Sequence, residues 1–223
     1  MSVLARNLSA AVYGCVLAWL AIEVCRFLGL RLAGGFRTAD AQQRAQTWQA
    51  VSLSFLISVL GSFAATWAER MLRSLGFDHA LIVGLDQRSS IGVSGVPDSV
   101  LKFGMTVAIE VIVIVAATAT LLAAARRPTW QIYSVIGLAE VVLHAYMGVP
   151  AITMIFYAAG RVWLFRRHGG FVPLVIGHAA FNLTMLVKWS APSPYVVVID
   201  GLFVLAAVAG VAQRSAPPIW AKA

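Results

Sequence analysis

Two polar residues, His178 and Asn182, lie four positions apart in an otherwise apolar stretch of this chain. On a helix, side chains at this spacing share one face. Polar groups placed in lipid cost free energy, so an ionisable residue in such a stretch indicates a functional site. The alternative is a structural hydrogen bond between neighbouring helices, which is common in helical bundles. The pair alone favours neither interpretation.

Three more ionisable residues lie in apolar segments upstream. Glu110 stands in a run of Val, Ile and Ala and has no basic residue within one helical turn. Its carboxylate must therefore be neutral, hydrated or paired across helices, because an isolated buried charge is costly. Glu140 and His144 are four residues apart and would share a helix face. The segments that carry these residues could direct all five side chains into one pocket.

The chemistry that such a set permits is the activation of a water molecule. A carboxylate and an imidazole that face one water can remove its proton, directly or through a bound metal ion. A second imidazole and an amide can donate hydrogen bonds to a developing oxyanion. We therefore expect the Glu110 carboxylate and the rings of His144 and His178 to approach within the reach of one water, about 3–6 Å. A hydrogen-bonded bundle core is the competing interpretation.

The composition indicates an integral membrane protein built from helices. Of the 223 residues, 60% are hydrophobic and 12% are charged, whereas soluble domains carry about 25% charged residues. Backbone in lipid must satisfy its own hydrogen bonds, which favours helices. The apolar runs, such as Val111-Ile-Val-Ile-Val, lack the alternation of a membrane β-barrel. We predict an all-α fold, a polytopic transmembrane helical bundle of about seven spans.

The predicted spans cover residues 8–30, 48–68, 102–125, 130–147, 150–166, 171–189 and 195–213. Residues 76–100 are the least hydrophobic stretch and predict a long loop, with a short interfacial helix near 77–85. Small residues in the second span predict close helix packing: Ser52, Ser54, Ser58, Gly61 and Ser62. We expect a single integral membrane domain over residues 1–223, because the chain has no internal repeat or second domain.

The charge of the chain is strongly positive, with a formal net charge of +8. In a soluble protein this would suggest a nucleic-acid partner. Here the basic residues mostly flank apolar runs, where they orient spans and meet anionic lipid head groups. We therefore expect membrane lipids as partners and no nucleic acid.

Residues 102–185 resemble the CPBP (CAAX protease and bacteriocin-processing, or Abi) family of intramembrane proteases. That family has a Glu-Glu-x-x-x-Arg motif, then Phe-x-x-x-His, then His-x-x-x-Asn. Gly177-His-Ala-Ala-Phe-Asn182 is similar to the third motif, and Glu140-Val-Val-Leu-His144 to the second. Glu110 falls where the first motif should lie, with Val111 and Val115 in place of its second Glu and its Arg.

The resemblance implies an intramembrane endopeptidase with its catalytic core at residues 102–185, acting on a membrane-associated peptide or protein. Glu110 and His144 would activate water, and His178 and Asn182 would stabilise the oxyanion. We expect Glu140, one turn from His144, to supply the carboxylate that the first motif lacks. A divalent metal ion such as zinc, if one is used, would be held by His144, His178 and Glu110.

Two other functions remain open at this stage. The valine at position 115 favours a catalytically inactive relative that acts as a scaffold or binding subunit with a membrane-protein partner. Buried Glu and His residues also fit proton or ion translocation, although the His-x-x-x-Asn spacing does not. For each of these functions we expect an integral protein of a bacterial inner (plasma) membrane.

Overall fold

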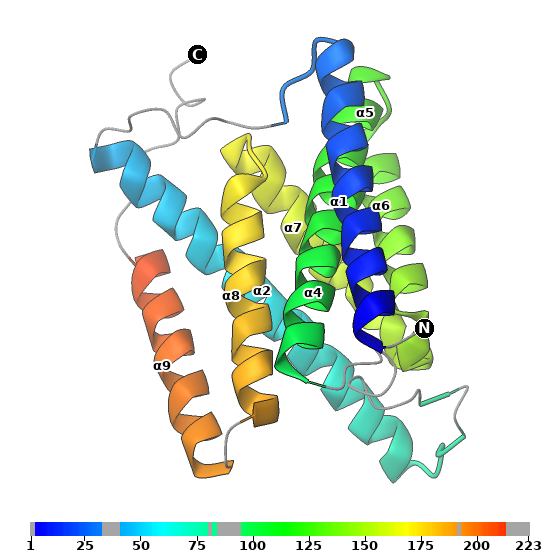
Figure 1. The fold of residues 1–223 in the computed structure, drawn as a ribbon, viewed down its shortest axis with the longest axis vertical. Helices are drawn as coiled ribbons and strands as arrows, with labels where there is room; N and C mark the ends of the chain where they lie inside the picture. The colour runs from blue at the N-terminus through cyan, green and yellow to red at the C-terminus, as the bar shows by residue number, and fades with distance from the viewer. Residues whose placement is uncertain (1–2, 33–40, 80–81, 84–94, 191–192, 213–223) are drawn as a thin grey trace.

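The computed structural model describes residues 3–32, 41–79, 82–83, 95–190 and 193–212, and over these residues the protein is all-helical (Figure 1). The long helices are α1 (Val3–Phe27), α2 (Ala41–Ser74), α4 (Val96–Val107), α6 (Thr129–Leu143), α7 (Met154–His168), α8 (Val172–Ser190) and α9 (Ser193–Ala212). The only β-type pairing in the described part of the chain is an isolated bridge between Val83 and Gly148.

One continuous helical rod passes through the middle of the protein. It begins with α4, continues as the π-helix η1 (Ala108–Ala117) and ends with α5 (Thr118–Ala124). In a π-helix the hydrogen bonds join residues five apart, so such residues lie one above the other. Glu110 and Val115 have this spacing, and both are buried. The rod therefore directs Glu110 into the protein rather than towards its surroundings.

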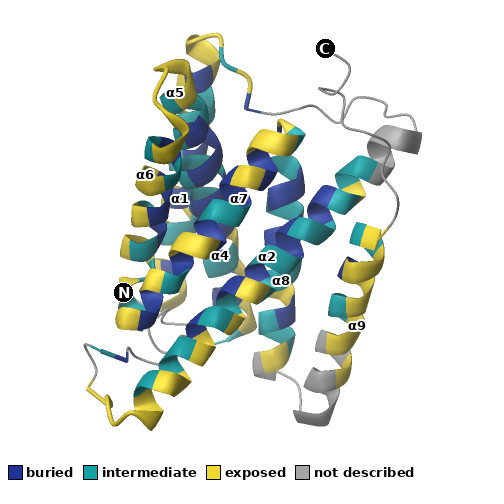
Figure 2. Cartoon of the chain, turned by 180° about the vertical axis from the view of Figure 1, so that it is seen from behind, coloured by how far each residue is buried: buried dark blue, intermediate teal, exposed yellow. Residues whose placement is uncertain are grey.

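Three helical segments are long and apolar enough to cross a membrane: Val3–Phe27, Gln46–Ser74 and Val96–Ala124. Three shorter apolar helices accompany them, at Thr129–Leu143, Val172–Lys188 and Gly201–Ala212. Many large apolar residues of these helices are exposed, and exposed positions follow the outer faces of the helices (Figure 2). Such a surface is typical of a protein that faces lipid. The prediction of an all-α protein with helices of membrane-spanning length is confirmed.

The fourth predicted span, residues 130–147, is shorter as a helix than expected. The α-helix ends at Leu143, and two 3₁₀ turns follow, η2 (Ala145–Met147) and η3 (Val149–Thr153). Gly148 between them has a φ of 70°, a conformation that glycine adopts without steric cost. His144 is therefore the cap residue of α6 rather than a residue inside a helix. The short helix expected near 77–85 falls largely outside the described residues, and Phe77–His79 are not helical.

The long helix α2 crosses the bundle diagonally and packs against α7, α8 and α9 (Figure 1). Small residues allow this close approach, because a Cβ added to Gly177 of α8 would lie 2.5 Å from the Ser54 Cβ. Ser54 Oγ also donates a hydrogen bond to the Leu174 carbonyl oxygen at 3.1 Å. A Cβ at Gly61 would lie 3.0 Å from the side chain of Tyr157 on α7. The prediction of close packing along the second span is confirmed at Ser54 and Gly61.

Candidate functional site

Polar side chains from four parts of the chain meet in the centre of the bundle. The π-helix η1 contributes one, α6 and its cap residue contribute two, and α7 and α8 contribute two each: Glu110, Glu140, His144, Tyr157, Arg161, His178 and Asn182. All five residues singled out from the sequence belong to this group. Tyr157 and Arg161 are additional members that were not predicted from the sequence.

Arg161 is fully buried and holds the group together. Its Nη1 donates hydrogen bonds to Glu110 Oε2 at 3.1 Å and to the Tyr157 hydroxyl at 2.6 Å. Its Nη2 lies 2.9 Å from His178 Nδ1. The Tyr157 hydroxyl in turn donates to Glu110 Oε2 at 3.1 Å. Of the three states open to the Glu110 carboxylate, the structure has the one in which it is paired across helices.

A signal for Arg161 was present in the sequence. The residue lies in the predicted span 150–166, four positions after Tyr157, and a cation in an apolar segment is a functional-site hypothesis for the same reason as a buried Glu. The positions next to Glu110 on its own helix hold no cation. The partner lies 51 residues further along the chain, on a different helix.

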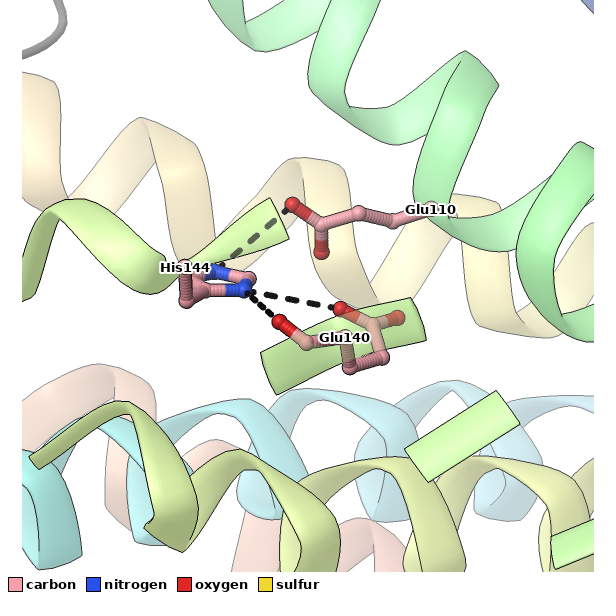
Figure 3. A group of neighbouring side chains, drawn as sticks. All are labelled: Glu110, Glu140 and His144. Atoms are coloured by element: carbon pink, nitrogen blue, oxygen red, sulfur yellow. Dashed lines mark hydrogen bonds and ion pairs between the residues drawn. The ribbon is translucent and has the colours of Figure 1, made fainter. Parts of the chain in front are cut away.

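His144 stands at the edge of the group and keeps 14% of its side chain exposed. Its Nδ1 lies 2.9 Å from the carbonyl oxygen of Glu140. A carbonyl oxygen only accepts hydrogen bonds, so Nδ1 carries the hydrogen and Nε2 has a free lone pair when the ring is neutral. Nε2 lies 3.9 Å from Glu110 Oε1 (Figure 3).

His178 approaches the same carboxylate from α8. Its Nε2 lies 3.8 Å from Glu110 Oε2. This distance and the 3.9 Å separation of His144 from Glu110 are too long for a direct hydrogen bond. A water about 2.8 Å from each atom would span either separation. Both values lie within the range expected from the sequence.

A cavity of about 540 Å³ opens onto this group. Glu110, His144, Tyr157, His178 and Asn182 line its inner end. From there it follows a polar stripe along α2 towards the end of that helix, formed by Ser58, Ser62, Thr66, Glu69 and Arg73. The spacing of these residues, three or four positions apart, keeps them on one helix face. The stripe gives water a polar route from the outside to Glu110.

Asn182 lies one helical turn after His178 and faces the same cavity. It is buried, and its Nδ2 has no hydrogen-bond partner among the described residues. A buried amide without a partner is costly in a folded protein. Its hydrogens are therefore available for a group that enters the cavity.

Glu140 has a different place from the one expected. It is fully buried and, among the described residues, does not line the cavity. Its Oε1 lies 3.6 Å from Arg161 Nη1 and its Oε2 lies 3.6 Å from His144 Nδ1. Neither oxygen has a hydrogen-bond partner in the described part of the chain. The Glu140 carboxylate lies on the same side of the His144 ring as the Glu110 carboxylate (Figure 3), with ligand atoms of the three residues within 4.8 Å of one another.

Among the described residues, the group that could hold a metal ion comprises Glu110, Glu140 and His144, with ligand atoms within 4.8 Å of one another. It contains Glu140 in place of the expected His178. Catalytic zinc sites are usually richer in imidazole or thiolate than this single-His set. Arg161 also lies within 3.6 Å of both carboxylates and supplies positive charge there. The donor set therefore does not fit zinc.

Comparisons with family models, with curated proteins and with solved structures find no match for this chain. Its function must therefore be inferred from the residues of the site and their geometry.

Proposed function

We propose that this protein is an intramembrane endopeptidase of the CPBP type, a seven-span bundle in a bacterial inner membrane. In this proposal it hydrolyses a peptide bond of a membrane-associated peptide or protein. The observation that carries the proposal is the convergence of Glu110, His144 and His178 on one cavity, with 3.9 and 3.8 Å between the carboxylate and the two imidazoles.

His144 is the residue that removes the proton from water. Its Nδ1 is anchored on a carbonyl oxygen, which leaves the Nε2 lone pair facing the space beside Glu110. The imidazolium that forms lies 3.9 Å from the Glu110 carboxylate and 3.6 Å from that of Glu140. Two flanking carboxylates stabilise this cation, as a buried carboxylate does for the histidine of a catalytic triad.

The attack forms a bond between the water oxygen and the carbonyl carbon of the substrate, and the carbonyl electron pair moves onto oxygen. In this proposal Asn182 and His178, which line the cavity beside Glu110, donate hydrogen bonds to this oxygen. Donors that are already oriented towards a developing oxyanion lower its free energy without reorganisation. When the tetrahedral intermediate collapses, the carbon–nitrogen bond breaks and His144 returns its proton to the leaving amine.

Water reaches the site along the polar stripe of α2 described above. A peptide bond buried in lipid is protected because water is scarce there, so a hydrolase in the membrane needs such a route. The cavity volume of about 540 Å³ accommodates a short extended segment of polypeptide.

The test compares membranes from cells that express the wild type with membranes from cells that express Glu110→Gln. New protein N-termini are identified in both by mass spectrometry. We expect termini that depend on the wild type and vanish in Glu110→Gln, because the amide cannot orient water and stabilise the imidazolium as a carboxylate does. The matched control is Glu23→Gln, since Glu23 lies on α1, pairs with Arg26 and is not among the described residues that line the cavity. It should leave the termini unchanged.

A second candidate function is a catalytically inactive scaffold or binding subunit. The observation that favours it is that Val111 and Val115, which replace two polar residues of the first motif, are fully buried and apolar. In that case Glu110→Gln and the wild type give the same set of N-termini, and a membrane-protein partner co-purifies equally with both.

A further inference from the structure

We infer that Arg161 is a positioning residue that fixes His178 as the neutral tautomer with its hydrogen on Nε2. The assignment of the tautomer stands on hydrogen-bond geometry alone. Its consequence for peptide hydrolysis rests on the proposed function.

The argument begins with the chemistry of the two side chains. A guanidinium group donates hydrogen bonds and never accepts them. Arg161 Nη2 lies 2.9 Å from His178 Nδ1, and both side chains are buried. Nδ1 must therefore accept with its lone pair. A neutral imidazole has one N–H and one lone pair, so the hydrogen is on Nε2.

Arg161 cannot turn away from His178, because its other contacts fix the plane of the guanidinium. Nη1 is bound to Glu110 Oε2 and to the Tyr157 hydroxyl, at 3.1 and 2.6 Å. The guanidinium carbon also lies 4.6 Å from the centre of the Tyr157 ring. That ring packs closely against Gly61 of α2, so it cannot move aside. Residues of three helices thus hold in place the guanidinium group that binds His178.

The groups that face His178 are consistent with this tautomer. Arg161 lies on the Nδ1 side, and the Glu110 carboxylate lies 3.8 Å from Nε2. The rings of Tyr157 and Phe181 lie beside the imidazole, with centres 6.3 and 6.5 Å away. A hydrogen on Nε2 thus points towards a carboxylate, whereas a hydrogen on Nδ1 would point at a cation.

The two histidines of the site therefore have opposite tautomers. His144 carries its hydrogen on Nδ1 and offers a lone pair at Nε2, whereas His178 offers an N–H at Nε2. This difference makes His144 the base and His178 a donor next to Asn182. Arg161 also supplies Glu110 with the cation that Val115 cannot supply.

The experiment measures the two ring nitrogens of His178 directly. The full chain is labelled with ¹⁵N-histidine, incorporated in lipid nanodiscs and studied by NMR at pH 7.5. The chain has 4 histidines, and the signals that disappear in His178→Gln belong to His178. We expect a protonated Nε2 and an unprotonated Nδ1 in the wild type. A hydrogen on Nδ1, or on both nitrogens, would overturn the inference.

Two variants show that Arg161 is the cause. Lysine also only donates hydrogen bonds, so Arg161→Lys should keep the wild-type tautomer. Arg161→Leu removes the donor and should give a mixture in which Nδ1–H is populated. If Arg161→Leu folds and gives the wild-type spectrum, Arg161 does not set the tautomer. If Arg161→Leu does not fold, the test rests on the spectra of the wild type and Arg161→Lys. A changed tautomer in Arg161→Lys would then contradict the inference.

The cleavage measurement is separate from the NMR measurement. If the peptidase function holds, loss of an oriented donor should lower the cleavage rate of Arg161→Leu by about 100-fold to 1,000-fold, with a smaller loss in Arg161→Lys. If the wild type has the expected tautomer but produces no new N-termini, the proposed function is wrong and the role of Arg161 is unaffected. Cleavage with the opposite tautomer would refute the role of Arg161 alone.

Discussion

Arg161 Nη1 and Glu110 Oε2 form an ion pair at 3.1 Å that joins α7 to the π-helix η1. Both side chains are almost completely removed from the surface, with 0% and 3% of their area exposed. Tyr157 contacts both partners and so fixes the geometry of the pair. This contact orders the catalytic carboxylate of the proposed enzyme and is also a structural link within the bundle.

The stability of the protein should depend on this pair. Arg161→Leu leaves two buried carboxylates, Glu110 and Glu140, without their cation, so we expect the free energy of unfolding to fall by about 3–5 kcal/mol. Thermal unfolding of the purified protein in one detergent measures the change. The control is Arg73→Leu, because Arg73 pairs with Glu69 at an exposed position and should cost less than about 1 kcal/mol. Equal losses in the two variants would contradict a structural role for the buried pair.

Glu140 and Glu110 should differ in their importance for cleavage. Glu140 does not line the cavity among the described residues, so its carboxylate acts on water only through His144 and Arg161. We expect Glu140→Gln to keep the cleavage rate within about tenfold of the wild type, whereas Glu110→Gln abolishes cleavage.

The measurement for this prediction is the yield of the wild-type-dependent N-termini in each variant at equal protein level. From the sequence we expect Glu140 to supply the carboxylate missing from the first motif. If that expectation holds, Glu140→Gln loses as much activity as Glu110→Gln, and the indirect role described here is wrong.

The polar stripe of α2 should be reached by water in the membrane. A cysteine at Ser62, which lines the cavity, should react with a charged, water-soluble thiol reagent. A cysteine at Leu60, two positions away with 64% of the residue exposed on the apolar outside, should react slowly. Thiolate formation and the reagent both need water, so lipid protects the second position.

This labelling is done in intact membranes after the native Cys15 and Cys25 have been replaced by serine and alanine. The extent of modification is read as a mass shift on denaturing gels. Faster labelling of Leu60→Cys than of Ser62→Cys would show that the stripe faces lipid or protein rather than water.

Some relationships in the site depend on helix periodicity alone. His178 and Asn182 share a face because they are four residues apart on α8, and this could be read without knowledge of any other helix. The apolar runs without alternation likewise indicated helices rather than a closed barrel, the two structures that satisfy the backbone in lipid, and the described residues are all-helical. The end of α6 at Leu143 was not predicted, because 3₁₀ turns replace the last part of the helix expected over residues 130–147.

The position of Arg161 beside Glu110 was decided only by the tertiary structure. The two residues are 51 positions apart, and their contact requires that α7 turn one particular face towards η1. That orientation results from close helix approach at two glycines. A Cβ at Gly61 would press against Tyr157, and a Cβ at Gly160 would press against Ile57. Such packing depends on the shapes of two helix surfaces together, which the periodicity of one helix does not contain. The sequence by itself therefore determined which residues could do chemistry. The packing of the helices decided which cation forms hydrogen bonds with them.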